Sequence, residues 1–465
     1  MLNVIKKNLS RDVSWAYMAQ GMGFLSSIIF IPFLIRTLSN EEMGLWYLFL
    51  GVSGFATLFD FGFGPTITRN ITYADSGVRE IVPQGYSENA GAERNQKLLS
   101  ELLSFSQNLY RFVSMLLLLI LIPVGYLYFQ NTQMSFNLEK VFACLVYLLA
   151  ILISFWFQPF NFLVLGLKKI REYNVALLAA KMMYVSMGIL VISFFPRLLT
   201  LCIIYLMSVV FERLLMGLAA RDDWKPISLS WQRFQEILKL LFYNSSRHGL
   251  CAIGSFFSFR VNILIAGAVL SAGDISSFGL TNQVLGLVNV FSMALLTTKA
   301  PQMSRELCLG NTKEAMRLFS YSWVSGVVMY LLLGLLGGLL APYFLDFIHS
   351  NVFWMSSTLY LFLLLTSFLE FNTGLFMVFM VTDNHIPYTK ALILTGGASI
   401  FFTYLFLFVF HLGLLGAVLS TFISQAIFNN WYWIYYFSKR YQISFFSLWS
   451  EGMREFKLAV KGALL

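Results

Sequence analysis

Charged side chains inside long apolar runs are the residues of this sequence best placed to do chemistry. In TLFDFGFGPTITRN, residues 57–70, a carboxylate (Asp60) and a guanidinium (Arg69) interrupt otherwise apolar sequence. A charge at the centre of a membrane-spanning helix costs about 2.5–3.5 kcal/mol on insertion scales, so each one needs a partner or a function. Further charges of this kind are Lys181, Glu212, Arg213, Arg260 and Glu370.

Small and polar residues around Asp60 recur at helical spacing, which places them on one face directed towards the protein interior. Arg69 follows Asp60 by nine residues, so on a straight helix the two side chains point apart. Pro65 cannot donate a hydrogen bond to the Phe61 carbonyl, and Gly62 and Gly64 weaken the same turn, which predicts a kink. Two interpretations stay open for each charge. Asp60 is either a structural carboxylate satisfied by a neighbouring helix or a coupling group, and Arg69 either snorkels to the interface or anchors substrate phosphates.

Two further cations and a carboxylate are candidates for a binding cavity. Arg260, in SFFSFRVNIL, lies too deep to snorkel easily and suits an anionic substrate group. Lys181 could act in the same way or snorkel, and Glu370 could pair with a cation or bind a coupling ion. Asn282 and Asn289 could donate to sugar hydroxyls, although amides also hold membrane helices together.

Motifs for covalent, metal or nucleotide chemistry are missing from the sequence. The four cysteines are far apart and form no CxxC pair, which predicts neither a zinc site nor a disulfide framework. HExxH, GxSxG and Walker A patterns do not occur. We therefore predict no catalytic residue, no metal, no cofactor and no enzymatic activity.

The elements that carry these residues are membrane helices. Hydrophobic residues make up 58% of the chain and charged residues 12%, far from the balance of a soluble domain. The apolar runs are about 20–28 residues long, enough to cross a bilayer as helices, and the pattern of a β-barrel is missing. We predict an all-α integral membrane protein with twelve spans: 12–37, 43–73, 105–130, 139–166, 172–195, 198–220, 243–270, 275–298, 318–345, 353–381, 387–411 and 413–436.

The distribution of cations predicts the orientation. With the N-terminus in the cytoplasm, only Arg36, Lys140 and Arg197 fall outside among the loop cations, so both termini should be cytoplasmic. The net charge of +9 therefore indicates membrane topology and no nucleic-acid partner. The predicted outer loops are short, which leaves the function to the helices.

An internal match suggests duplicated halves. TLSNEEMGLWYL, residues 37–48, aligns with VLSAGDISSFGL, residues 269–280, at an offset of 232 residues; chance similarity between two turns is the alternative. Six spans per half would make parallel repeats around a central cavity. The expected divisions are a first half (1–220), a cytoplasmic linker (221–242), a second half (243–437) and a cytoplasmic tail (438–465).

The segment LSNEEMGLWYLFLGVSGFATLFDFGFGPTITRNITYA, residues 38–74, resembles the Wzx-type O-antigen and polysaccharide flippases. These belong to the multidrug/oligosaccharidyl-lipid/polysaccharide exporter superfamily. The matching residues are Glu42, Met43 and Gly44, then Asp60, Phe61 and Gly62, and finally Arg69. Length, span number and the turn LGLKKIREYN extend the likeness over the chain.

The resemblance implies alternating-access movement of an undecaprenyl-pyrophosphate-linked oligosaccharide to the periplasmic leaflet of a bacterial inner membrane. Arg260, Lys181 and Arg69 would hold the pyrophosphate, and the amides the sugars. H⁺ or Na⁺ is the expected coupling ion, with membrane lipids and polysaccharide assembly proteins as further candidate partners. The alternatives are an ion-coupled small-molecule or drug exporter of the same superfamily and, less favoured, a membrane-embedded polysaccharide-processing enzyme.

Overall fold

A computed structural model describes residues 28–82, 93–130, 137–382 and 388–464. Within these ranges every element of regular structure is a helix. The prediction of an all-α integral membrane protein is confirmed, because the helices are long, apolar and numerous. The chain divides into two compact units, residues 1–252 and 253–465.

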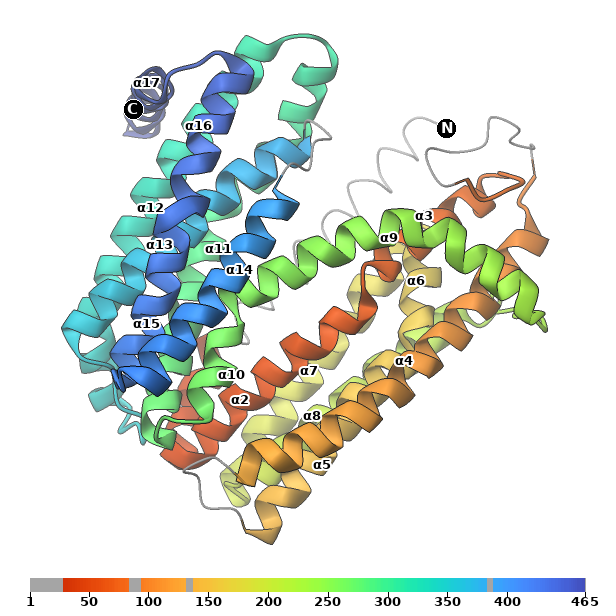
Figure 1. Cartoon of the computed structure of the whole chain (residues 1–465), viewed down its shortest axis with the longest axis horizontal. Coiled ribbons are helices and arrows are strands. Elements are labelled where there is room, and N and C mark those ends of the chain that lie inside the picture. Colours follow the sequence, from red (N-terminus) through yellow and green to blue (C-terminus); the bar gives the residue numbers. More distant parts are fainter. Residues whose placement is uncertain (1–27, 83–92, 131–136, 383–387, 465) are drawn as a thin grey trace. The chain divides into compact units, whose positions relative to one another are not determined.

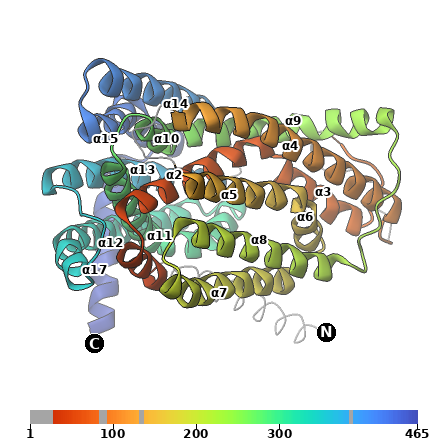
Figure 2. The ribbon, with the colours of Figure 1, turned by 90° about the horizontal axis from the view of Figure 1, so that it is seen from below.

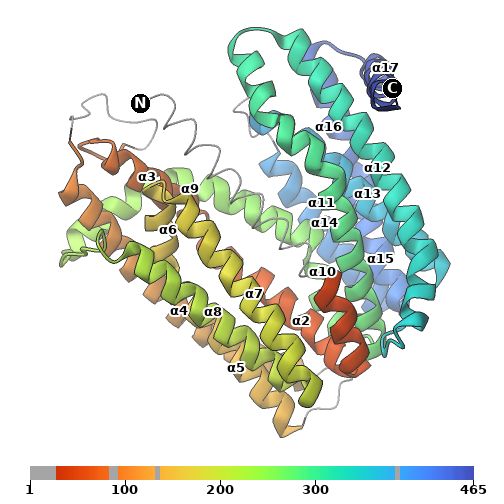
Figure 3. The same cartoon turned by 180° about the vertical axis from the view of Figure 1, so that it is seen from behind.

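The first unit is a bundle of long helices that pack side by side. α5 packs on both α4 and α8, and α7 packs on α8. Figure 1 shows α4 and α5 running along each other, and Figure 3 shows α7 beside α8 from behind. Its elements after the helix Ile28–Thr37 are α2 (Asn40–Ala56), η1 (Thr57–Asp60), α3 (Phe63–Asp75), α4 (Gln96–Gln130), α5 (Leu138–Trp156), α6 (Gln158–Gly166), α7 (Ile170–Phe194) and α8 (Leu198–Ala220).

The second predicted span is broken rather than simply kinked. α2 ends in the short 3₁₀ segment η1, and α3 begins after Phe61 and Gly62, both of which have positive φ. A Cβ on Gly62 would lie 2.6 Å from the carbonyl oxygen of Ser245 in the helix α9 (Trp231–Phe259). Glycine therefore serves both the left-handed turn and the close approach of a second backbone.

Ion pairs gather at the two ends of the first unit. At one end Asp223 binds Arg94 at 2.7 Å and Lys169 at 2.9 Å, which ties the turn after α8 to the start of α4 and the turn before α7. At the other end Lys140 binds Glu41 at 2.7 Å. The long apolar surfaces of the helices lie between these two charged ends, as expected for a bundle that spans a membrane.

The second unit holds the remaining elements. α11 packs on α12 and α13, and the C-terminal amphipathic helix α17 packs on α12; Figure 2 shows α10, α14 and α15 grouped together. The elements that follow α9 are α10 (Val261–Gly267), α11 (Ala272–Cys308), α12 (Thr312–Phe347), α13 (Ser357–Thr382), α14 (Thr389–Tyr404), η2 (Leu405–Val409), α15 (Gly413–Ser424), η3 (Gln425–Asn429), α16 (Asn430–Tyr441) and α17 (Phe445–Leu464).

The number of spans agrees broadly with the predicted twelve. Nine helices of the described residues are long and apolar enough to cross a membrane, and the pair α9–α10, bent by 48°, makes a tenth. The first predicted span lies partly outside the described residues, which show only its end as the helix Ile28–Thr37. The last predicted span is divided by the π-helical segment η3 into α15 and α16.

The matched segments of the internal repeat begin their helices in the same way. Ser39 caps α2 and bonds to Glu42 at 2.8 Å, and Ser271 caps α11 and bonds to Asp274 at 2.7 Å. A serine cap with an acidic residue three positions later satisfies the free N–H groups of a helix start. The sequence match therefore corresponds to a shared local structure at the 232-residue offset.

Candidate functional site

Asp60 lies at the break between η1 and α3 and is held by neutral donors. The backbone N–H of Gly64 donates to its carboxylate oxygens at 3.2 and 3.3 Å, so Asp60 caps the first turn of α3. The hydroxyl of Tyr110 on α4 donates to Oδ1. The start of a helix carries partial positive charge, which also favours a carboxylate there. In the part of the chain that the structure describes, no salt bridge joins Asp60 to Arg69 or another cation.

Two of the predicted cations of the first unit are exposed. Arg69 lies on α3 and Lys181 on α7. Neither side chain forms a salt bridge with a described carboxylate. Both side chains are therefore accessible to an anionic ligand.

Arg213, by contrast, is a buried structural residue. Its guanidinium donates to Asn161 at 2.6 Å, Ser154 at 2.7 Å and Gln158 at 2.8 Å, and it lies 3.3 Å from Glu212. These contacts hold α8 against the junction of α5 and α6. The arginine is therefore committed to helix packing.

In the second unit, Arg260 occupies the bend between α9 and α10. Its backbone ends one helix and caps the next, and its side chain is exposed. The sequence placed it near the middle of a span, and the bend of 48° explains how a charged residue is presented there. A break in a membrane helix leaves a polar surface suited to a binding site.

Glu370 of α13 is half-buried and interacts electrostatically with Arg260. The two side chains interact at longer range than a salt bridge, because no described pair of their nitrogen and oxygen atoms lies within 4.0 Å. Glu370 is thus near a cation, one of the two roles considered from the sequence.

The two amides of α11 differ in their surroundings. Asn282 is exposed and donates at 2.9 Å to the carbonyl of Phe278 in its own helix. Asn289 is half-buried, and its side-chain oxygen has no hydrogen-bond partner among the described residues. Gly286 between them is exposed, with open space where a side chain would begin. The exposed amide on this face of α11 is therefore Asn282, whereas the side-chain oxygen of Asn289 is enclosed.

A buried polar network in the second unit was missed by the sequence analysis. Asn262 of α10 accepts from Thr403 at 2.8 Å and Ser399 at 3.2 Å and donates to Thr421. Hydroxyls four residues apart on α14 were the available signal. The network joins α10, α14 and α15 beside the π-helical segment η2, a type of distortion that is frequent at functional sites.

The structure therefore brings some of the predicted residues together and leaves others apart. Arg260 and Glu370 interact within the second unit. Arg69 and Lys181 belong to different helices of the first unit, and no hydrogen bond or salt bridge of the described residues links either of them to another predicted binding residue. Two pockets open on the first unit, and neither is lined by a predicted binding residue.

Several solved structures share this fold across nearly the whole chain. Lipid II flippase MurJ in an inward closed conformation has a TM-score of 0.69 at 11% identity, covering 95% of this chain and 90% of that one. A multidrug resistance MATE family transporter of the MOP superfamily, inward-facing, has a TM-score of 0.63 at 15% identity, covering 90% and 95%.

A MOP superfamily transporter from Pyrococcus furiosus has a TM-score of 0.57 at 13% identity, covering 93% of this chain and 94% of that one. No protein-family model and no curated protein matches the sequence. The chain thus has the fold of MOP superfamily transporters, and the similar structures are transporters and flippases.

Proposed function

We propose that this protein is a flippase that moves an undecaprenyl-pyrophosphate-linked oligosaccharide from the cytoplasmic to the periplasmic leaflet of a bacterial inner membrane. Transport would occur by alternating access, with both termini in the cytoplasm. The resemblance of residues 38–74 to Wzx-type flippases supports the cargo, and a lipid II flippase is among the structures of the same fold.

The observation that carries the proposal is the set of exposed cations on membrane helices. Arg260, Lys181 and Arg69 are exposed, and no described carboxylate forms a salt bridge with any of them. A pyrophosphate offers these side chains several oxygens for charge-assisted hydrogen bonds. Arg213 shows what an arginine used for packing looks like in the same chain, since its charge is buried and paired.

The polar face of α11 would serve the sugars of the cargo. Asn282 and Asn289 present amide groups beside the open position at Gly286. Amides both donate and accept, as sugar hydroxyls do, so a flat series of them tolerates several sugars. The lipid tail would stay in the bilayer.

Energy for transport would come from H⁺ or Na⁺ through Asp60 or Glu370. Both carboxylates lie at distortions or contacts of membrane helices, where a change of protonation or ion binding alters local packing. Asp60 accepts hydrogen bonds from Gly64 of α3 and Tyr110 of α4. Glu370 interacts electrostatically with Arg260 at the α9–α10 bend.

The test is the lipid-linked glycan that accumulates when the protein is absent. Deletion in the native host should trap an undecaprenyl-pyrophosphate-linked repeat unit and abolish surface glycan, and a plasmid copy should restore display. Lipid extracts analysed by mass spectrometry give the first result and immunoblots of whole cells the second. Unchanged glycan in the deletion strain would contradict the proposal.

A drug exporter of the same superfamily is the second candidate, because MATE multidrug resistance transporters share the fold. Overexpression would then raise resistance to cationic drugs, and deletion would leave surface glycan unchanged. Resistance and glycan display in the same pair of strains distinguish the two functions.

A further inference from the structure

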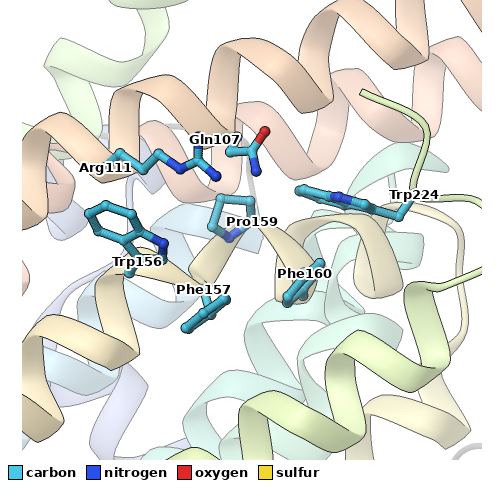
Figure 4. Close-up of a pocket in the computed structure, with 7 residues that line it drawn as sticks. All are labelled: Gln107, Arg111, Trp156, Phe157, Pro159, Phe160 and Trp224. Carbon is cyan, nitrogen blue, oxygen red and sulfur yellow. The ribbon is translucent and has the colours of Figure 1, made fainter. Parts of the chain in front are cut away.

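A small aromatic pocket with one cation lies on the first unit, apart from the proposed cargo residues. It has a volume of about 40 Å³ and is lined by Gln107, Arg111, two tryptophans, two phenylalanines and a proline (Figure 4). A water needs about 10–15 Å³ of such space, so the pocket admits a group of a few heavy atoms. In Figure 4 the guanidinium of Arg111 and the amide of Gln107 extend towards each other above Pro159.

The charge of Arg111 has an aromatic partner but no carboxylate partner among the described residues. Its guanidinium carbon lies 5.4 Å from the ring centroid of Trp156, a cation–π contact. Its Nε is enclosed and has no hydrogen-bond partner among the described residues. The pocket therefore offers an anion a positive charge that no described carboxylate neutralises.

Two apolar stripes lead away from the pocket along packed helices. On α4, Met115, Leu118 and Ile122 continue the helical face of Arg111 and are exposed. On α5, Leu149, Leu145 and Phe142 continue the face of Trp156 and are also exposed. α4 and α5 pack against each other. Acyl chains attached to an anion in the pocket would thus lie along a continuous apolar surface.

The pocket also lies where the bundle changes from charged to apolar. Trp224, one of its walls, directly follows Asp223, which binds Arg94 and Lys169 at the charged end of the unit. The indole of Trp224 packs edge-to-face on Phe160, with ring centroids 4.6 Å apart. Tryptophan beside a cation at such a boundary is typical of the headgroup level of a membrane.

We propose that this pocket binds the phosphate of an anionic membrane phospholipid, whose acyl chains follow the α4 and α5 stripes. Arg111 and Gln107 would donate to the phosphate oxygens, and the indole rings would cover the glycerol. The bound lipid would be a fixed part of the first unit, distinct from the proposed cargo.

Native mass spectrometry of the purified full-length protein, titrated with phosphatidylglycerol, tests the proposal. The wild-type protein should retain one phosphatidylglycerol about tenfold more tightly than Arg111→Gln, since a charge-assisted hydrogen bond is lost. Arg221→Gln is the matched control, because Arg221 is exposed and its salt bridge among the described residues is with its neighbour Asp222, at 3.4 Å. It should bind the lipid as the wild-type protein does.

Three further arms identify the ligand and protect against a folding artefact. Diacylglycerol, which has no phosphate, should not compete, and millimolar inorganic phosphate should not displace the lipid. Trp224→Leu removes a wall that lies outside the helices and should weaken retention even if Arg111→Gln fails to fold. Equal retention of phosphatidylglycerol by the wild-type, Arg111→Gln and Trp224→Leu proteins would overturn the proposal. Displacement of the lipid by inorganic phosphate alone would overturn it as well.

Discussion

Tyr110 donates a hydrogen bond from its hydroxyl group to the carboxylate of Asp60, and so joins α4 to the break between η1 and α3. The backbone N–H groups of Gly64 and Gly62 also donate to this carboxylate. All of these donors are neutral, and no described cation forms a salt bridge with Asp60. Protonation of Asp60 would therefore not have to displace a paired cation, which suits a coupling group in the proposed transport cycle.

Asp60→Asn should separate the structural from the coupling role of this residue. The amide keeps an oxygen that accepts from Gly64 and Tyr110, so the protein should reach the membrane at the wild-type level. An amide cannot take up a proton, so proton-coupled transport should be lost. Immunoblots of membranes and of surface glycan measure the two outcomes, and full display by Asp60→Asn would assign Asp60 to helix capping alone.

Tyr110→Phe is the companion variant, because it leaves the carboxylate and removes one donor. We expect it to retain transport and to lose about 1.5–3 kcal/mol of stability, the usual contribution of one hydrogen bond to a charged group. Thermal unfolding of the purified protein measures the change. Transport loss with unchanged stability would instead place Tyr110 in the proton path.

Gly62→Ala should destabilise the first unit. The residue has a φ of 74°, and an added Cβ would lie 2.6 Å from the Ser245 oxygen. A left-handed conformation costs an ordinary residue about 1–2 kcal/mol before any clash is counted. Gly125→Ala, which meets nothing within 4 Å, is the control. A lower melting temperature is expected for Gly62→Ala only; equal melting temperatures would contradict the packing described here.

The membrane helices could be predicted from sequence because crossing a bilayer requires only a sufficient length of apolar residues. A distortion of the second span at Gly62, Gly64 and Pro65 could be predicted as well, because glycine and proline weaken a helix locally. The predicted kink is a complete break in the structure, with positive φ at Phe61 and Gly62. The close contact of Gly62 with Ser245 could not be predicted, because Ser245 is far away in the sequence.

The candidate site residues also divide into those visible in the local sequence and those that depend on distant contacts. Arg260 was recognisable because a charge in an apolar run is visible locally. Asn262 was missed because its partners Ser399 and Thr421 lie 137 and 159 residues away. An asparagine in a membrane helix is informative only once its neighbours are known.

Two arginine substitutions should have opposite effects. Arg260→Ala removes an exposed side chain that forms no salt bridge with a described carboxylate and should destabilise the protein by about 1 kcal/mol, the typical effect of a single substitution, while blocking the proposed glycan display. Arg213→Ala leaves the partners of a buried guanidinium unpaired and should cost about 3–5 kcal/mol. Thermal unfolding and surface glycan are measured for both variants. Normal display by a folded Arg260→Ala protein would remove Arg260 from the mechanism.

The ion pairs of Asp223 with Arg94 and Lys169 should make the stability of the fold depend on pH. Burial by itself would raise the pKa of this carboxyl, but the hydrogen bonds and charges of Lys169 and Arg94 outweigh it and lower the pKa below 3.8. Because the folded pKa is the lower one, the stabilisation is complete above the unfolded pKa and is lost as the pH falls through the folded value. Asp223→Asn should therefore melt below the wild-type protein at about pH 7, and the difference should shrink below about pH 4. Melting curves of both proteins across this range measure it, and a difference independent of pH would show that the Asp223 charge does not stabilise the fold.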